Sequence, residues 1–196
     1  MKFIALFYII AAYFLGAIPF SYLVGKLRGV DLLRTGSKSS GATNVYRTLG
    51  FGYAAFAFFL DAAKGYVAIF CASYILPGQH VFMVVCGLAA ILGHTFTPFL
   101  KFKGGKGVAT GVGVLFFIQP VIAMIGFLLE FIIIFFTRYV SLASILSALV
   151  ILILAYLPFF QMPASYIGLI TVAVIYIIYK HIPNIKRLIK GQENKV

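Results

Sequence analysis

The amino-acid sequence predicts an all-α, polytopic integral membrane protein with seven transmembrane helices, its N-terminus outside and its C-terminus cytoplasmic. Hydrophobic residues make up 63% of the chain and charged residues only 10%, whereas soluble proteins carry about 25% charged residues. Lipid cannot satisfy exposed backbone N–H and C=O groups, so long apolar runs must cross the bilayer as helices. Such runs extend along the whole chain, and we expect residues 1–196 to form a single membrane-embedded domain.

Seven apolar runs provide the predicted spans. A helix needs roughly 20 predominantly apolar residues to cross a bilayer. The fourth run is short and Pro120 follows it directly, so runs four and five could also form one kinked helix. In chain order the runs are 3–25, 51–76, 81–100, 108–119, 120–136, 140–157 and 165–179.

The positions of the basic residues decide between these topologies. With seven spans, all of the 16 Lys and Arg residues except Lys2 and Lys64 lie in inner segments. Merging runs four and five would move Arg138 and the basic C-terminal tail outside, against the positive-inside rule. We therefore predict seven spans in the inner (plasma) membrane, with three polar segments and the active site at the cytoplasmic face.

The net charge of +12 does not indicate nucleic-acid binding, because basic residues confined to loops are what membrane topology requires. Cys71 and Cys86 lie in apolar runs without CxxC spacing and are interpreted as packed hydrophobic residues. With four acidic residues and three histidines, no cluster shows metal-ligand spacing. We predict no metal and no cofactor.

The first polar segment, residues 36–47, collects groups that bind phosphate oxygens. It offers hydroxyls, a carboxamide, an arginine fork and glycines that leave backbone N–H groups accessible. The alternative is a solvated basic loop with helix-capping serines. Its candidate residues are Ser37, Gly41, Thr43, Asn44 and Arg47.

The second segment, residues 93–110, places Lys106 among glycines. Glycine allows a close backbone approach to a ligand, and successive N–H groups form anion-binding concavities. Gly104, Gly105 and Lys106 are the main candidates, with Lys103 as a further one. Gly107 stands where a Walker A loop requires Ser or Thr, so a nucleotide loop is excluded.

His94 opens the same segment as a further candidate. Phe99, five residues later, stands where many acyl-CoA-dependent glycerolipid acyltransferases have an aspartate. His94 therefore lacks the partner of a His-x4-Asp pair, and a histidine packed at a helix end is the alternative interpretation.

The third segment, residues 181–193, contains His181 and Asn184 with basic residues that include Lys186. A basic tail that binds anionic lipid would explain the charges. It would not require His181 and Asn184, which share a face if Pro183 opens a helix. We predict that these two residues bind a ligand.

Polar residues within or next to the apolar runs are harder to interpret. Ser141 and Ser144 lie in the first turn of the sixth span, where helix amides attract anions, although capping is the alternative. Asp61 and Lys64 are three residues apart on one helical face and can satisfy each other. Glu130 has no account from the sequence.

Together the three segments resemble the bacterial acyl-phosphate-dependent glycerol-3-phosphate acyltransferases, the PlsY family. The matching patterns are GS-xx-SGATNV-x-R, GH-x-F-xx-F-xx-FKGGKGVAT and H-xx-NIKRL-xx-G-x-E, preceded by GAIPFSYLVGK at 16–26. The resemblance implies a seven-helix membrane acyltransferase of phospholipid biosynthesis. Its substrates would be a fatty acyl phosphate and sn-glycerol 3-phosphate, and its products lysophosphatidic acid and inorganic phosphate.

On this interpretation we expect Lys106, Arg47, His181 and Asn184 to be catalytic. Ser37, Gly41, Thr43, Asn44, Gly104 and Gly105 would bind the acyl phosphate. Lys106, His181, Asn184, Ser144 and Ser141 would bind glycerol 3-phosphate, with His94, Lys103 and Lys186 as further candidates. The general base is left open between a histidine and a substrate phosphate. The expected partners are the two substrates and the lipid bilayer, with loose association with other phospholipid-synthesis enzymes as a further expectation. A membrane transporter of a small phosphorylated anion and a scaffold that holds lipid-synthesis enzymes through its basic face are the alternatives.

Overall fold

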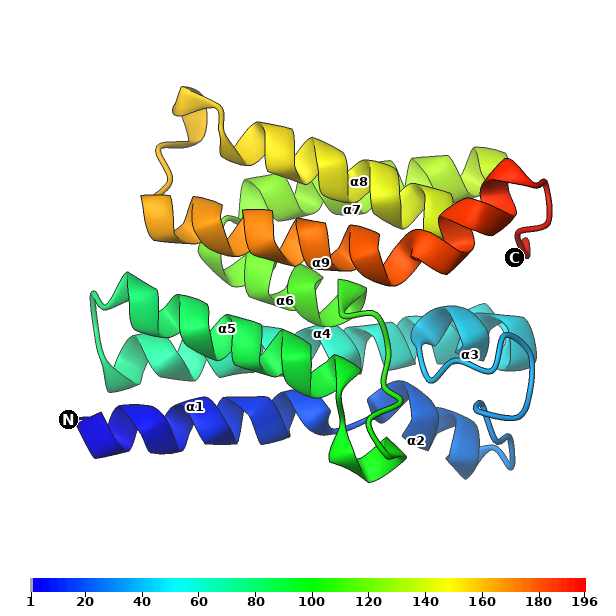
Figure 1. Ribbon diagram of the computed structural model, residues 1–196, viewed down its shortest axis with the longest axis horizontal. Helices are drawn as coiled ribbons and strands as arrows, with labels where there is room; N and C mark the ends of the chain where they lie inside the picture. Colours follow the sequence, from blue (N-terminus) through cyan, green and yellow to red (C-terminus); the bar gives the residue numbers. More distant parts are fainter. Residues whose placement is uncertain (1) are drawn as a thin grey trace. The chain divides into compact units, whose positions relative to one another are not determined.

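The computed structural model describes residues 2–196, which form helices joined by turns and include no strand (Figure 1). The chain divides into two compact units, Met1–Phe117 and Ile118–Val196, called here the N-terminal and C-terminal units. The all-α class predicted from hydropathy is confirmed. That the whole chain acts as one domain stays a prediction.

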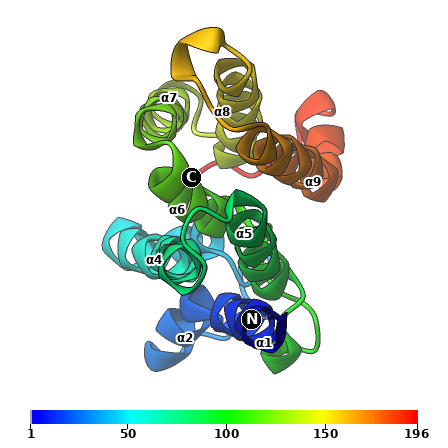
Figure 2. The same cartoon turned by 90° about the vertical axis from the view of Figure 1, so that its left-hand side faces the viewer.

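The N-terminal unit is built on close helix packing. Helix α1 lies along α5, and α4 packs against α5 (Figures 1 and 2). A Cβ at Gly93 would overlap the Tyr13 carbonyl, and one at Gly113 would overlap the Ala62 carbonyl, so these glycines let backbones approach closely. The elements are α1 (Lys2–Ala17), α2 (Phe20–Leu27), α3 (Ala42–Leu49), α4 (Phe51–Ile75), α5 (His80–Thr95), the 3-10 turn η1 (Pro98–Leu100) and α6 (Val108–Ile118).

The first predicted span is interrupted where it was expected to be one helix. Helix α1 ends at Ala17 and α2 begins at Phe20, because Pro19 has no N–H to continue the helical ladder. Two carbonyls at the break find partners on other helices or turns. Thr97 Oγ1 donates to Ala17 O at 2.6 Å, and Lys64 Nζ donates to Ile18 O at 2.7 Å.

The C-terminal unit contains α7 (Pro120–Thr137), α8 (Val140–Ala155), the 3-10 turn η2 (Pro158–Phe160) and α9 (Ala164–Ile189). Helix α8 packs against both α7 and α9. Pro120 occupies the first turn of α7, where a missing N–H has no cost. The expected break between the fourth and fifth runs is thereby confirmed.

Pro183 does not open a new helix, which was the condition under which the sequence placed His181 and Asn184 on one face. It lies inside α9, which continues past the predicted end at residue 179 as far as Ile189. Pro183 is on an exposed part of the helix, where loss of one backbone hydrogen bond is tolerated most easily. His181 and Asn184 therefore share a face of one continuous helix.

Five described segments are long and apolar enough to cross a membrane: Phe3–Leu27, Phe51–Ile75, His80–Leu100, Pro120–Thr137 and Ala164–Ile189. Helices α6 and α8 are apolar but shorter. Large apolar side chains such as Phe7, Phe59 and Phe135 are exposed on these helices, as lipid-facing residues are. The chain is a helical membrane protein.

Candidate active site

The buried side chain of Asn44 holds the first polar segment together through hydrogen bonds to its backbone. Its side chain is fully buried, and its amide nitrogen donates to the carbonyls of Leu32 at 2.9 Å, Thr35 at 3.0 Å and Ser39 at 2.9 Å. The side-chain oxygen of Asn44, Oδ1, accepts a hydrogen bond from the Ser37 N–H at 2.8 Å. The side chain thus closes the irregular segment that precedes α3 onto the helix itself.

This arrangement changes the role expected for Asn44. Two amide hydrogens already serve three backbone carbonyls, so the carboxamide supports the loop instead of presenting a donor to a phosphate. Gly41 stands at the N-cap of α3, and Thr43 lies in its first turn, where helix amides and dipole favour an anion. Ser37 is exposed, and Thr43 and Arg47 are half-buried.

The glycines of the second segment are placed differently from the prediction. Gly104 N–H donates to Thr95 O at 3.0 Å, and Gly105 N–H donates to His94 O at 3.2 Å. These two amides therefore pair with the C-terminal carbonyls of α5 and are not presented to a ligand. The need for glycine is steric, because a Cβ at Gly105 would overlap the His94 ring.

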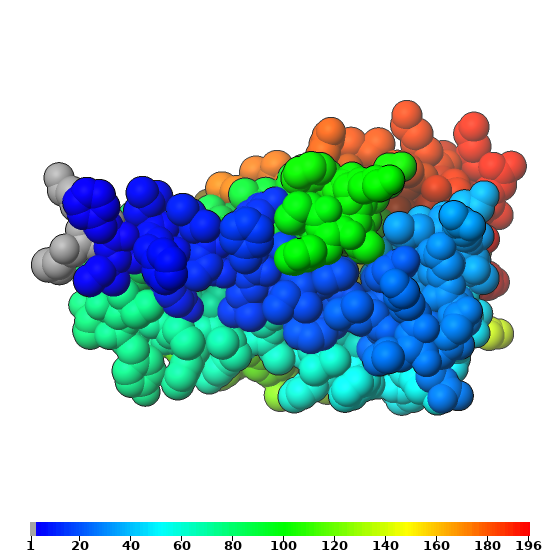
Figure 3. Space-filling view, turned by 90° about the horizontal axis from the view of Figure 1, so that it is seen from below, coloured from blue at the N-terminus to red at the C-terminus, as the bar shows by residue number. Residues whose placement is uncertain are grey.

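Lys106 follows directly, half-buried, before Gly107 at a φ of 85° leads into α6. Lys103 is exposed, and its carbonyl accepts a hydrogen bond of 3.4 Å from Ser40 Oγ, which links the second segment to the first. In Figure 3 the turn around residue 100 (green) lies at the surface beside α1 and α2 (blue).

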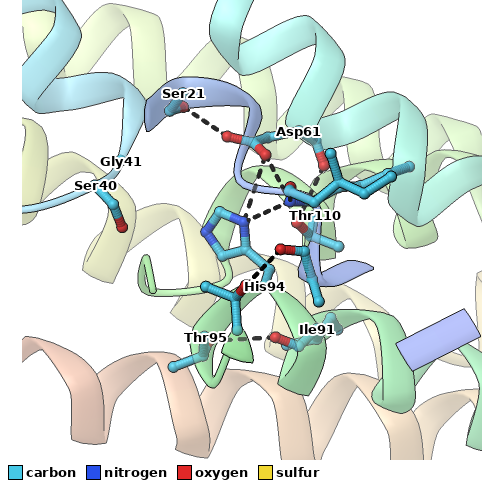
Figure 4. A network of polar contacts seen from close by, with 12 residues as sticks. Ser21, Ser40, Gly41, Asp61, Ile91, His94, Thr95 and Thr110 are labelled. Carbon is cyan, nitrogen blue, oxygen red and sulfur yellow. Dashed lines mark hydrogen bonds and ion pairs between the residues drawn. The ribbon is translucent and has the colours of Figure 1, made fainter. Parts of the chain in front are cut away.

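His94 lies at the centre of a buried network that the sequence did not predict (Figure 4). Lys64 Nζ is 2.6 Å from Asp61 Oδ1 and 2.9 Å from His94 Nδ1. Asp61 Oδ2 accepts from Ser21 Oγ at 2.6 Å. The prediction that Asp61 and Lys64 pair with each other is confirmed, but the pair extends to α2 and α5.

In the C-terminal unit, three donors converge on Glu193. Its Oε1 accepts from Asn184 Nδ2 at 2.6 Å and from Ser141 Oγ at 3.0 Å, and its Oε2 pairs with Arg187 Nε at 2.7 Å. Burial alone would raise the pKa of Glu193, but the hydrogen bonds from these three side chains and the Arg187 charge hold that pKa below its usual value. Glu193 is therefore an anion that orders its neighbours.

The sequence contained the residues of this cluster but not its geometry. Glu193 lies beyond the end of α9, and Gly191 at a φ of 66° turns the chain back so that Gln192 N–H reaches Arg187 O at 2.8 Å. The advance signals were the glycine two residues before the glutamate and the motif H-xx-NIKRL-xx-G-x-E, which ends on Glu193. Lys186, a further predicted site residue, is exposed on the same helix.

His181 and Ser144 also have defined partners. His181 Nδ1 lies 2.8 Å from Ile177 O; because a carbonyl only accepts, Nδ1 carries the ring proton. Ser144 Oγ donates to Glu130 Oε1 at 2.7 Å. This hydrogen bond provides a partner for Glu130, whose role could not be interpreted from the sequence. Ser141 and Ser144 thus serve carboxylates in this structure, and their predicted contact with glycerol 3-phosphate stays a prediction.

Fold and site together define an integral membrane protein with hydroxyls, amides and cations at its polar segments. The family model for glycerol-3-phosphate acyltransferase matches residues 6–191. This chain belongs to that family, the PlsY family, and is an acyltransferase.

Individual relatives agree over nearly the full length. The glycerol-3-phosphate acyltransferase of Fusobacterium nucleatum is 43% identical over 190 residues, with 96% of each chain covered. That of Aquifex aeolicus is 40% identical over 191 residues, covering 97% of this chain and 98% of the relative.

Solved structures agree as well. A crystal structure of PlsY (YgiH), an integral membrane glycerol 3-phosphate acyltransferase in its glycerol 3-phosphate form, has a TM-score of 0.91 and 41% identity, covering 98% of this chain and 95% of that one. The lysophosphatidic acid form gives a TM-score of 0.89 and 40% identity, with 97% and 94% covered.

Proposed function

We propose that this protein transfers the acyl group of a fatty acyl phosphate to the 1-hydroxyl of sn-glycerol 3-phosphate, releasing lysophosphatidic acid and inorganic phosphate. The observation that carries the proposal is the near full-length similarity to PlsY in two forms, one named for glycerol 3-phosphate and one for its acylated product. An acyl group added to the first compound gives the second, which defines the reaction as acyl transfer.

The choice of acyl phosphate as donor rests on the residues of the chain. Phe99 stands where a carboxylate would complete a His-x4-Asp pair. His94 instead accepts at Nδ1 from Lys64, which leaves that nitrogen engaged. An acyl phosphate is a mixed anhydride with a good leaving group, so charge stabilisation and positioning provide most of what catalysis requires.

In the N-terminal unit we assign the donor phosphate to the first segment. The amides at the start of α3, with Gly41 and Thr43, and the exposed hydroxyl of Ser37 suit phosphate oxygens. Arg47 and Lys106 would neutralise the charge that grows on the phosphate as it leaves. Asn44, Gly104 and Gly105 would act by holding the two segments in shape.

In the C-terminal unit we assign glycerol 3-phosphate to the face of α9 that carries His181 and Asn184. The Glu193 carboxylate orients the Asn184 amide and the Arg187 guanidinium, so this face is rigid before a ligand arrives. Pre-organised donors of this kind reduce the entropic cost of orienting a substrate.

The reaction balances without a protein base. A bond forms between the acceptor O1 and the acyl carbon, the bond from that carbon to the bridging oxygen breaks, and the electron pair leaves with phosphate. We propose that a substrate phosphate oxygen takes the hydroxyl proton. Neither Asp61 nor Glu193 is available for this step, because each carboxylate is already paired with a cation.

We further propose that the shorter apolar helices α6 and α8 also cross the bilayer, which gives seven spans. The distribution of Lys and Arg then places the polar segments on the cytoplasmic side. Glycerol 3-phosphate would arrive from water and the acyl chain from lipid.

The test is purified protein in detergent with glycerol 3-phosphate and either acyl phosphate or acyl-CoA. We expect lysophosphatidic acid from acyl phosphate only, and a loss of at least about a hundredfold in turnover for Lys106→Ala, because a charge at the leaving group is removed. Lys101→Gln, an exposed lysine of the same loop, is the matched control. No product from acyl phosphate would refute the proposal.

A further inference from the structure

Three charged or ionisable side chains are buried together in the N-terminal unit, and the proposed reaction uses none of them. The side chains of Asp61 and Lys64 are each 1% exposed and that of His94 is 8% exposed. Ionisable groups within membrane-spanning helices are costly and by default have a function. If Asp61 and Lys64 only neutralised each other, their polar contacts would be confined to α4. Instead they also contact Ser21, the Ile18 carbonyl and His94.

Lys64 uses all of its donors on three different elements. An ammonium group has three N–H bonds and no acceptor. Its partners are Asp61 at 2.6 Å, Ile18 O at the α1–α2 break at 2.7 Å, and His94 Nδ1 at 2.9 Å. His94 Nδ1 also lies 3.5 Å from Asp61 Oδ1. We assign Nδ1 as the acceptor of the charged Lys64 ammonium, which can only donate, so the ring is neutral and its proton is on Nε2.

This tautomer excludes His94 as the general base. A neutral imidazole takes up a proton only at the nitrogen that carries a lone pair. In His94 that nitrogen is Nδ1, which already holds the Lys64 ammonium. The role left for the His94 ring is to hold neighbouring groups in place.

The network contacts both ends of the segment that carries Lys106. On one side, the Gly105 backbone lies against the His94 ring, and all three atoms nearest to a Cβ built at Gly105 belong to that ring. On the other side, Thr110 Oγ1 in the first turn of α6 donates to Asp61 O at 3.0 Å. Figure 4 shows His94, Asp61 and Thr110 in one network. The peptide next to Lys106 and the helix that follows are thus held by the same group of residues.

We infer that the Asp61–Lys64–His94 triad positions residues 104–107 and that His94 is a positioning residue for the Lys106 ammonium. The inference rests on the proposed function in so far as Lys106 is assigned to substrate phosphate. Lys64 fixes the orientation of the His94 imidazole, and the imidazole in turn fixes the position of the Gly105 backbone. The Gly105 backbone position determines where the Lys106 side chain begins.

A double-mutant cycle tests this contact. Gly105→Ala introduces a Cβ into the His94 ring and should raise the KM for glycerol 3-phosphate or acyl phosphate about tenfold, with a smaller change in kcat. His94→Ala removes the obstructing ring, so the double variant should have a KM within about threefold of His94→Ala alone. Gly52→Ala, where a Cβ meets nothing within 4 Å, is the matched control.

Other outcomes would overturn the inference. Additive effects of the two substitutions would show that the loop does not depend on the ring. A loss of kcat at unchanged KM in His94→Ala would indicate a base. His94→Asn keeps an acceptor opposite Lys64 and serves as the second variant; failure of both variants to fold would make the triad a purely structural element.

Binding separates this test from the test of the reaction. The same variants are titrated with inorganic phosphate and with glycerol 3-phosphate, and affinity is measured by thermal stabilisation. If the wild-type protein forms no lysophosphatidic acid, the proposed function fails. The coupling between residues 94 and 105 is still measured in the phosphate affinity, and its absence there would refute the positioning role.

Discussion

The two units hold their polar segments by opposite means. In the N-terminal unit a neutral carboxamide, Asn44, gathers backbone groups of the preceding loop, and the charged triad is enclosed within membrane-spanning helices. In the C-terminal unit one carboxylate, Glu193, gathers side-chain donors beyond the end of α9. The Asn44 carboxamide fixes backbone groups and does not itself ionise, whereas Glu193 fixes side chains and depends on its ionisation.

The largest effect is expected at Asn44. Asn44→Ala leaves the buried Leu32 carbonyl, the part-buried Thr35 and Ser39 carbonyls and one N–H without their partner, and a buried group of this kind costs about 1–3 kcal/mol. We expect a loss of at least about 3 kcal/mol in the free energy of unfolding, measured by thermal unfolding in detergent. Thr43→Ala, one residue away, should lower activity without a comparable loss of stability. Equal stability losses in the two variants would contradict the contrast.

A smaller, pH-dependent effect is expected at Glu193. Because its pKa is lowered in the folded protein, ionised Glu193 contributes stability above its usual value of 4.5, and this contribution is lost as the pH falls below it. Wild-type protein should therefore be more stable than Glu193→Gln by several degrees in Tm at pH 7, and this difference should shrink progressively as the pH is lowered below 4.5. A difference that did not change with pH would show that the hydrogen-bond geometry, and not the charge, is what stabilises this cluster.

The smallest effect is expected at Ser144. Ser144→Ala removes one hydrogen bond between α7 and α8, and such bonds in membrane proteins contribute about 0.6–1.7 kcal/mol. Ser147, one turn further along α8, has a buried hydroxyl with no hydrogen-bond partner among the described residues. Ser147→Ala is therefore the control and should change the unfolding free energy by less than Ser144→Ala. The reverse order would show that the bond to Glu130 contributes nothing.

Hydropathy and charge predicted the helical membrane class and the break before Pro120, because both follow from local composition. The effect of proline depended on what surrounded it. Pro19 interrupts a helix whose freed carbonyls find Thr97 and Lys64, whereas Pro183 stands on an exposed face and the helix continues.

The motifs named the polar residues but not their partners. Asn44, Gly104 and Gly105 looked like ligand-binding groups because sequence cannot show that their hydrogen bonds are used within the chain. Glu193 and Asp61 were missed as organising centres for the same reason. Their roles depend on contacts between residues that are distant in the sequence, such as Ser21 with Asp61 and Ser141 with Glu193.

The break at Pro19 has a consequence for biogenesis. The carbonyls of Ala17 and Ile18 are satisfied by groups made later in synthesis, on α4 and just after α5. Unpaired carbonyls in lipid cost several kcal/mol each. We therefore expect the first segment to reach its final broken form only once Lys64 and Thr97 are in place.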